Sequence, residues 1–282
     1  MTARPLRVLF AVAALALPLA GCDIKVDDGK VSLGVSRGRA SDEWVRSYTL
    51  GKGARFELLN ENGGIDVRGG KGQAVRVKAF REVSAGSDEE AQARLQSLKM
   101  REEVDADRVL IEALTDPSRG FARGRGLSVR YEVEVPPGLA LSIKTQNGAV
   151  KFENVEGRIL ASTTNGTVAG DDLSGSVEAA SVNGSVQMDL AAVTGDIRLT
   201  TVNGAVRLLM PKSADVDLQA TTVNGGVSVD ERLGLAKASG GRSGFGPTTS
   251  ISGRLNNGGS NVVLQTTNGG VRVALRGENA AP

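Results

Sequence analysis

Alternating polar and apolar residues run through much of the first half of the chain. The pattern occupies five segments, at residues 55–58, 64–68, 74–80, 108–114 and 127–135. Alternation with a period of two is typical of a β-strand that buries one face. We therefore expect a strand-rich lead-in over residues 44–145.

One segment interrupts this alternation with the signature of a helix. Ser87 lies three residues ahead of a glutamate, which is the spacing of a capping box that satisfies the first free amides of a helix. Ala91, Leu95 and Leu98 then share one helical face. We expect one substantial helix over residues 88–99, packed against the first strands.

From residue 147 onward an Asn-Gly pair returns at a near-constant interval. The asparagines of these pairs are Asn147, Asn165, Asn183, Asn203, Asn224 and Asn268. The first four intervals are 18, 18, 20 and 21 residues, and each of the first five pairs is followed by one variable residue and a valine. A repeat of this period without a helical pattern predicts stacked strands.

Two columns of apolar residues share this period. The first is Val150, Val168, Val186, Val206 and Val227, and the second is Ile159, Val177, Ile197 and Val216. A second glycine-centred turn falls about halfway between the pairs, at Gly157, Gly175 and Gly195. Each repeat is therefore expected to hold two short strands. Residues that recur once per coil stack above one another in a solenoid.

These patterns predict a mainly β chain whose residues 146–276 form a parallel β-solenoid with coils of about 18–21 residues. A meander of hairpins is the alternative, because Asn-Gly is also a strong signal for a tight hairpin turn. A meander gives no reason for both turn types and both columns to share one period. The pattern loosens over residues 234–246, where we expect a surface loop, and resumes as strands at 249–254, 261–266 and 270–274. Residues 277–282 are expected to be a flexible end.

The Asn-Gly corners have a physical use in a solenoid. Glycine accepts the positive backbone angle of a sharp corner, and asparagine amides stacked coil on coil can hydrogen-bond as a ladder. We interpret the corners as structural, with ligand binding by the asparagines as the alternative.

The first residues resemble an export signal. Arg4 and Arg7 precede an uncharged apolar run, and residues 1–21 end just before Cys22, the one cysteine of the chain. This arrangement resembles the bacterial lipobox, which implies cleavage before Cys22 and lipidation of its thiol. The alternative is an ordinary signal peptide, or a short buried apolar segment, with an incidental cysteine. Residues 22–43 are polar, with a turn at residues 27–30, and are expected to be a tether.

Charge and cysteine content narrow the class of protein. Two of the 34 basic residues lie in the leader, so the rest of the chain carries 32 basic against 32 acidic residues. This balance argues against nucleic acid as a partner. A lipidated Cys22 leaves no cysteine for a disulfide, and several acyl chains would attach the protein durably to a membrane.

The sequence offers little catalytic chemistry. There is no histidine, which excludes Ser-His-Asp and Cys-His catalysis and histidine-ligated metals. No phosphate-binding loop is present, and we predict no cofactor and no metal site. Carboxylates are the one route to hydrolysis, and the candidates weighed are Asp171, Asp172, Asp189, Asp196, Asp215 and Asp217. Their spacing argues against a catalytic pair.

A glycine-rich basic segment is the most suggestive surface element. It contains Arg119, Arg123 and Arg125, followed by Arg130. Such a loop could contact anionic lipid or polysaccharide near a membrane. The alternative is a solvated loop whose charge is balanced by acids such as Glu112 and Asp116.

The repeated phrases together resemble the bacterial "putative adhesin" family of cell-envelope domains. The segments that carry the resemblance are residues 145–148, 163–166, 202–204 and 265–269, with Val-Pro-Pro-Gly at 135–138. The likeness spans about residues 48–273. It implies an exported or membrane-attached β-solenoid-like domain, and it brings no catalytic residues.

Three functions follow as hypotheses. The first is a non-enzymatic, lipid-anchored cell-envelope protein that presents a repetitive β surface to an envelope protein or a polysaccharide. The second is an accessory or sensor in envelope-stress signalling. The third, which the carboxylate spacing disfavours, is a carbohydrate-active β-helix enzyme. All three place the protein in the cell envelope, on the periplasmic or outer face of a membrane.

Overall fold

The computed structural model describes residues 24–27, 30–33, 38–51, 53–114, 126–242 and 248–277. The chain divides into two compact units, Met1–Arg37 and Gly38–Pro282. In the first unit, β1 (Ile24–Asp27) and β2 (Lys30–Leu33) form an antiparallel hairpin in which Asp27 lies opposite Lys30. The two strands flank the turn predicted at residues 27–30, whose central residues 28 and 29 lie outside the described residues.

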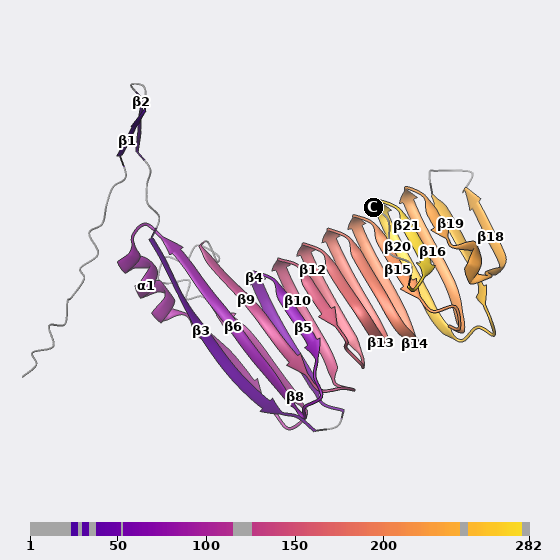
Figure 1. The fold of residues 1–282 in the computed structure, drawn as a ribbon, viewed down its shortest axis with the longest axis horizontal. Helices are drawn as coiled ribbons and strands as arrows, with labels where there is room; N and C mark the ends of the chain where they lie inside the picture. The colour runs from indigo at the N-terminus through magenta and orange to yellow at the C-terminus, as the bar shows by residue number, and fades with distance from the viewer. Residues whose placement is uncertain are drawn as a thin grey trace, which may run out of the picture. The chain divides into compact units, whose positions relative to one another are not determined.

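The second unit is mainly β, with one α-helix among its described residues and a 19-stranded sheet (Figure 1). The predicted mainly β class with one helix is therefore confirmed. The sheet is mixed: strands in the repeats pair in parallel, and antiparallel pairs lie at both ends of the stack. A wholly parallel sheet is therefore not what the chain forms.

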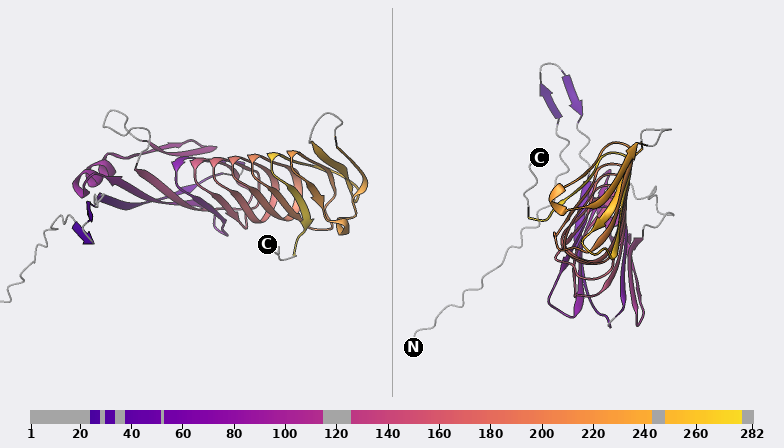
Figure 2. Two further views of the ribbon diagram at one scale, coloured as in Figure 1. Left: turned by 90° about the horizontal axis from the view of Figure 1, so that it is seen from above. Right: turned by 90° about the vertical axis from the view of Figure 1, so that its right-hand side faces the viewer.

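The first repeats lie side by side in sequence order (Figure 2). Their strands, in chain order, are β10 (Ala140–Asn147), β11 (Val150–Glu153), β12 (Ile159–Asn165), β13 (Val168–Asn183), β14 (Val186–Asn203), β15 (Val206–Met210), β16 (Val216–Asn224) and β17 (Val227–Val229). In the first coils each residue pairs with its counterpart one repeat later, so Leu141 lies beside Ile159 and Ile159 beside Val177. This parallel register is the one expected of a repeat with stacked columns.

At the second turn of the repeat, the strand more often bends and continues than ends. A break occurs at Gly157, between β11 and β12, but β13 runs through Gly175 and β14 runs through Gly195. The pairing of β13 with β14 shifts register between Gly170 and Val177. A bulge absorbs the bend while both neighbours keep the strand paired, so the prediction of two separate short strands per repeat was wrong for these two strands.

The repeat begins earlier than predicted, inside the lead-in. The strands β4 (Arg55–Asn62) and β5 (Ile65–Gly69) pair in parallel with β10 and β11. On their other side they pair in parallel with β8 (Arg108–Leu114) and β9 (Leu127–Val135). The stack of coils thus continues across the expected boundary at residue 146.

The last coil of the chain is inserted into the stack out of sequence order. It consists of β20 (Ser260–Asn268) and β21 (Val271–Leu275). The strand β20 pairs in parallel with β14 on one side and with β16 on the other. Similarly, β21 lies between β15 and β17. The coil of β16 and β17 therefore has no direct pairing with the coil that precedes it in sequence.

This insertion corrects both predicted apolar columns. Val271 lies between Val206 and Val227. In the second column Ile197 is followed by Val262 and then by Leu218, so Val216 is not a member. The reason is that near-identical coils offer near-identical edges, and the sequence period alone does not state the order of stacking.

Antiparallel strands cover both ends of the stack. At one end lie β3 (Gly38–Thr49), β6 (Ala74–Ala85) and β7 (Lys99–Val104), and at the other β18 (Ala236–Arg242) and β19 (Thr249–Leu255). The folded unit therefore begins at Gly38 and not near residue 44. Because β18 pairs with β19, the segment predicted as a loop at 234–246 contains a strand. A short 3-10 helix, η2 (Glu231–Leu233), precedes β18.

The predicted helix is α1 (Asp88–Ser97). The Ser87 hydroxyl accepts a hydrogen bond from the Glu90 backbone N–H at 3.2 Å, and the Glu90 carboxylate accepts from the Gly86 N–H at 3.0 Å. The predicted face of Ala91, Leu95 and Leu98 is buried. The helix packs on β3 and β6, as expected.

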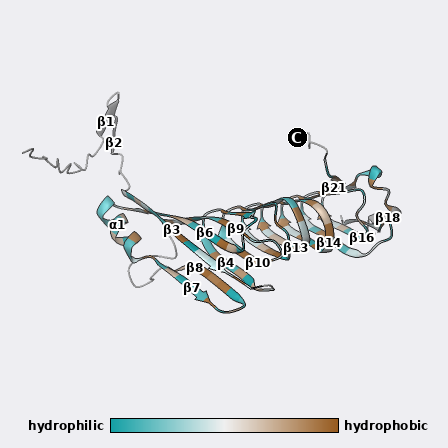
Figure 3. Ribbon diagram, turned by 60° about the horizontal axis from the view of Figure 1, so that its bottom comes forward, coloured by the Kyte–Doolittle hydropathy of each residue, from teal (hydrophilic) through white to brown (hydrophobic). Residues whose placement is uncertain are grey.

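The core is a narrow file of side chains inside the coils. Hydrophobic and hydrophilic residues alternate along the strands (Figure 3), and most inward positions of the repeats are aliphatic, with Phe152 as an aromatic exception. Val150, Val168 and Val186 have no exposed surface. The aromatic residues Phe56 and Tyr131 are buried in the lead-in, where the core is built from larger side chains.

Candidate functional site

The Asn-Gly corners form a continuous ladder of side-chain amides. Each asparagine Nδ2 donates to the Oδ1 of the asparagine in the preceding coil, at 2.7–2.9 Å. The ladder runs in the order Asn62, Asn147, Asn165, Asn183, Asn203, Asn268 and Asn224. The predicted ladder is therefore present, and it follows the inserted stacking order.

A second file of polar side chains lies just inside the ladder. Two residues before every ladder asparagine except Asn62, a buried hydroxyl donates to the glycine carbonyl of the neighbouring coil. Thr201 Oγ1 reaches the Gly184 carbonyl at 2.7 Å, and Thr163 Oγ1 reaches that of Gly148 at 3.0 Å. The lead-in coil has Asn60 at this position, whose Nδ2 donates to the carbonyls of Gly63 and Val129. Such bonds remove the cost of burying a carbonyl.

Glycine is required at the corners chiefly because the coils approach closely. A Cβ on Gly184 would lie 1.9 Å from the Gly166 carbonyl oxygen, and one on Gly204 would lie 2.2 Å from that of Gly184. Neither glycine has a positive φ, although Gly63 does, at 124°. The expectation that a positive backbone angle explains the glycine is therefore corrected: at most corners backbone contact between coils is the reason.

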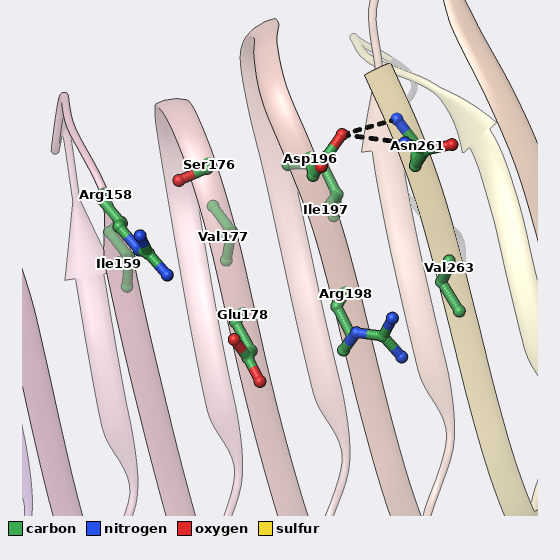
Figure 4. Close-up of a pocket in the computed structure, with 10 residues that line it drawn as sticks. All are labelled: Arg158, Ile159, Ser176, Val177, Glu178, Asp196, Ile197, Arg198, Asn261 and Val263. Atoms are coloured by element: carbon green, nitrogen blue, oxygen red, sulfur yellow. Dashed lines mark hydrogen bonds between the residues drawn. The ribbon is translucent and has the colours of Figure 1, made fainter. Parts of the chain in front are cut away.

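The outer face of the repeats carries a long groove. It crosses β12, β13, β14, β20, β16 and β19, and its two adjoining hollows share Asn261 and Val263. One column of outward side chains contains Arg158, Ser176, Asp196, Asn261, Asp217 and Arg254, and a second contains Glu178, Arg198, Val263, Gln219 and Ser252. The hollow in Figure 4 has a volume of about 570 Å³. Strand pairing sets these side chains about 4.8 Å apart from coil to coil.

The charges of the groove fall into fixed and free sets. Asp196 Oδ1 accepts from the Asn261 backbone N–H at 2.9 Å and from its Nδ2 at 3.4 Å (Figure 4). Arg254 Nε donates to Asp217 at 2.8 Å, and this contact is the first cause of the lowered pKa of the Asp217 carboxyl. These contacts connect β20 of the inserted coil with β14, and the end strand β19 with β16.

Three charged side chains of the groove remain available to a ligand. Arg158, Glu178 and Arg198 are exposed, and none has an ion pair or hydrogen bond to another described residue. Arg158 directly precedes β12, Glu178 lies on β13, and Arg198 lies on β14 (Figure 4). An exposed, unpaired charge keeps its capacity to bind a partner, because no internal bond has to be broken first.

The structure brings three of the six weighed aspartates together. Arg276 pairs with Asp172, and its Nε lies 2.9 Å from Asp189 Oδ1. Asp172 has a φ of 56° at the irregular part of β13, next to Asp171. Burial raises the pKa of the Asp189 carboxyl, and Asp171 and Asp172 add to this effect against the opposing charge of Arg276. Arg276 directly follows β21, so these ion pairs connect the end of β21 with β13 and β14.

The other weighed aspartates hold neighbouring strands or a turn in place. Asp215 accepts hydrogen bonds from the Asn257 backbone and side chain, while Asp196 and Asp217 hold the groove contacts described above. No group of metal-ligating residues occurs in the part of the chain that the structure describes. Within the same residues, no helix combines the length and the apolar character needed to cross a membrane.

The predicted contact and lipidation residues fall largely outside the described part of the chain. Cys22, Arg119, Arg123 and Arg125 all lie there. Arg130 is described, and it is a strand residue of β9 whose guanidinium lies over the Phe80 ring at 4.4 Å and 3.5 Å from Glu132. Arg130 thus belongs to the sheet surface.

A family model identifies the chain. The Toastrack model, DUF4097, matches residues 56–274, which is most of the second unit. The chain belongs to the Toastrack family. The resemblance predicted from the repeated phrases is thereby confirmed, and the match begins within β4, where the stack of coils was found to include the lead-in.

Solved structures of other bacterial proteins match the chain at low sequence identity. A "putative cell adhesion protein" from Clostridium sporogenes is 13% identical, with a TM-score of 0.44. The match covers 84% of the present chain and 100% of the Clostridium chain. A "putative adhesin" from Bacteroides fragilis is 12% identical, with a TM-score of 0.28, over 83% and 97% of the two chains. No curated protein matches the chain.

The sequence patterns did not predict two features of the Toastrack domain, namely the first corner of the ladder and the columns of the groove. Asn62-Gly63 begins the ladder, and the signal for it was the same dipeptide followed by Gly64 and Ile65. The groove columns were missed for another reason. Some of their members pair between coils that are not consecutive in the sequence. The repeat period therefore gives no indication that Arg198 lies beside Val263.

Proposed function

We propose that this Toastrack protein is a non-enzymatic, lipid-anchored cell-envelope protein that binds a partner through the repetitive outer face of its coils. The observation that carries the proposal is the groove across the outer face. Its side chains are held in two columns by strands paired on both sides, which is a preorganised surface with little ordering cost on binding.

We also infer that the repeat region is a β-solenoid capped at both ends. The support is the register of the coils, in which each corner asparagine lies beside the corner asparagine of the next coil in the stack. Solenoids of this kind build extended binding surfaces more readily than a single converging pocket.

The engagement of the aspartates supports a binding role over catalysis. A glycosidase needs two free carboxyl groups on either side of the scissile bond. Here Asp172 and Asp189 share one guanidinium, and Asp196, Asp215 and Asp217 hold turns or neighbouring strands. The carbohydrate-active alternative therefore has no candidate pair among these residues.

The proposed envelope location rests on the lipobox-like leader that ends before Cys22. Lipidation at Cys22 would hold the protein at a membrane surface through its acyl chains. Replacing this residue tests the anchor directly: Cys22→Ser is expected to abolish acyl labelling and to release the protein from the membrane fraction. Unchanged labelling and retention would contradict lipid anchoring.

In-cell photo-crosslinking tests the binding surface. A photoreactive residue at position 198, in the groove, is expected to capture a partner, whereas one at Gln187, elsewhere on the same strand, is the matched control. Arg158→Ala with Glu178→Ala should then reduce capture from position 198 without loss of stability, because both side chains are exposed and unpaired.

The identity of the captured partner separates the hypotheses. Envelope polysaccharide or a surface protein would support the binding or adhesive role. One recurrent integral membrane protein would instead favour the accessory or sensor in envelope-stress signalling. Equal capture from positions 198 and 187, or none from either, would contradict the groove as the binding surface.

A further inference from the structure

Eight Asn-Gly dipeptides occur in the sequence, and they share one intrinsic reactivity. They are the seven of the ladder and Asn257-Gly258. In such a pair the backbone nitrogen of the glycine can attack the side-chain amide carbon of the asparagine, because glycine has no Cβ to obstruct the approach. Whether it does so depends on what the two groups are bonded to.

The glycine nitrogen is engaged in all but one of these pairs. In six corners the glycine N–H donates to the backbone carbonyl of the asparagine in the next coil of the stack, at 2.8–3.1 Å, and the Gly258 N–H donates to the Leu255 carbonyl at 3.0 Å. The Gly225 N–H has no acceptor among the described residues. The reason is topological: its coil, formed by β16 and β17, is the last of the stack, so no further corner asparagine lies beside it.

The side-chain amide of Asn224 is also the less restrained end of the ladder. Asparagines inside the ladder, such as Asn203, both donate through Nδ2 and accept at Oδ1. Asn224 donates to Asn268 at 2.8 Å, and its Oδ1 accepts from no described residue. Both Asn224 and Gly225 are exposed.

We propose that Asn224 is a deamidation site and the first of the eight asparagines to react. The Gly225 nitrogen forms a bond to Cγ of Asn224, the Cγ–Nδ2 bond breaks, and the proton of the Gly225 N–H leaves with the amide as ammonia. The product is a five-membered succinimide. Water then adds to either carbonyl of the ring and opens it to aspartate or isoaspartate.

The size of the preference follows from the bonds that must open. Attack within an internal corner requires the loss of the glycine N–H bond and of two ladder bonds, whereas attack at Asn224 requires the loss of one ladder bond. Each net hydrogen bond is worth about a factor of five in an equilibrium constant, so Asn224 is expected to react about 25-fold faster than the internal corners. The carboxylate that results cannot donate to Asn268, which weakens the outermost rung.

Site-resolved mass spectrometry tests the proposal on the full chain. The folded protein is incubated in mildly alkaline buffer, digested, and each of the eight sites is scored over time for the mass gain of deamidation. Asn224 should lead the other sites. The same incubation in denaturant is the matched control, and there the eight rates should converge because every amide is free.

Two outcomes would overturn the proposal. One is an internal corner that reacts as fast as Asn224 in the folded protein. The other is an Asn224 that stays intact while the denatured chain deamidates there. As a second measurement, Asn224→Gln should remove most of the early ammonia release from the folded protein, because glutamine would have to close a six-membered ring, which forms more slowly than the five-membered succinimide. Unchanged release would place the reaction elsewhere.

Discussion

At the scale of the residue, the corner is built from three positions with separate tasks. The threonine hydroxyl satisfies a buried carbonyl, the asparagine amide joins the coils at the surface, and the glycine allows two backbones to touch. The phrase Thr-x-Asn-Gly is thus a set of contacts between coils. This explains why the phrase persists where the intervals between corners vary from 18 to 21 residues.

Gly184→Ala tests the contact between backbones. The new Cβ would lie 1.9 Å from the Gly166 carbonyl oxygen, so the coils must separate, and we expect a loss of about 3 kcal/mol or more in the free energy of unfolding. Gly226→Ala is the matched control, because a Cβ there meets no atom within 4 Å. Denaturant unfolding measures both, and equal effects would contradict the contact as the reason for glycine.

Asp230 should contribute to the loss of folding stability at acidic pH. Hydrogen bonds from Arg232 lower the pKa of this carboxyl from 3.8 to about 2. A folded-state pKa below the unfolded value stabilises the fold above about pH 4, and this contribution is lost as the pH falls through 2. In a carboxyl-detected NMR titration Arg232→Gln should return the Asp230 midpoint toward 3.8; an unchanged midpoint would contradict the assigned cause.

At the scale of the element, strand pairing decides more than the repeat does. The coil of β20 and β21 is the last in sequence, yet it is held on both sides by earlier coils. The chain can insert it because β19 runs antiparallel to β16 and covers its outer edge, which leaves the inner edge of β16 for β20. The helix α1, by contrast, follows from local signals in its own sequence.

Val186→Asp tests the buried column that runs through the strands. Val186 has no exposed surface, so an aspartate there would be an unpaired charge in the core, and we expect a loss of about 4 kcal/mol or more. Val182→Asp, at a position that is 42% exposed, is the control and should change stability by about 0.5 kcal/mol or less. Thermal unfolding of both variants would show whether the column faces the core.

At the scale of the whole second unit, the coils are stacked in one dimension and closed at both ends. Open strand edges invite pairing with other chains, and antiparallel strands at each end of the stack reduce that exposure. At the N-terminal end β3, β6 and β7 serve this purpose, with α1 packed on the first two. In such a stack each coil interacts chiefly with its neighbours, so damage at one end should remain local.

Leu255→Asp tests this locality. Leu255 lies on β19, is fully buried and pairs with Val216 of the last coil. We expect hydrogen–deuterium exchange to accelerate in β16, β17 and β19 while the strands β4, β8 and β9 keep their protection. Uniform loss of protection along the unit would mean that the stack unfolds as a single cooperative body.

The sequence by itself determined the local parts of this protein. The period of two located β8 and β9 to the residue, the capping box located the start of α1, and the Asn-Gly series located the corners and their ladder. Each of these features depends on residues close together in the chain. Alternation, capping and tight corners are decided by neighbours within a few positions, so the pattern alone carries them.

The tertiary structure alone decided the order of the coils and, with it, the groove. Near-identical coils present near-identical edges, so the sequence does not distinguish stacking on the preceding coil from stacking on the inserted one. Long-range pairing makes that choice, because the return of the chain through β19 closes one edge of β16 and β20 fills the other. The same choice leaves the corner at Asn224 last in the stack and sets Arg198 beside Val263 in the groove.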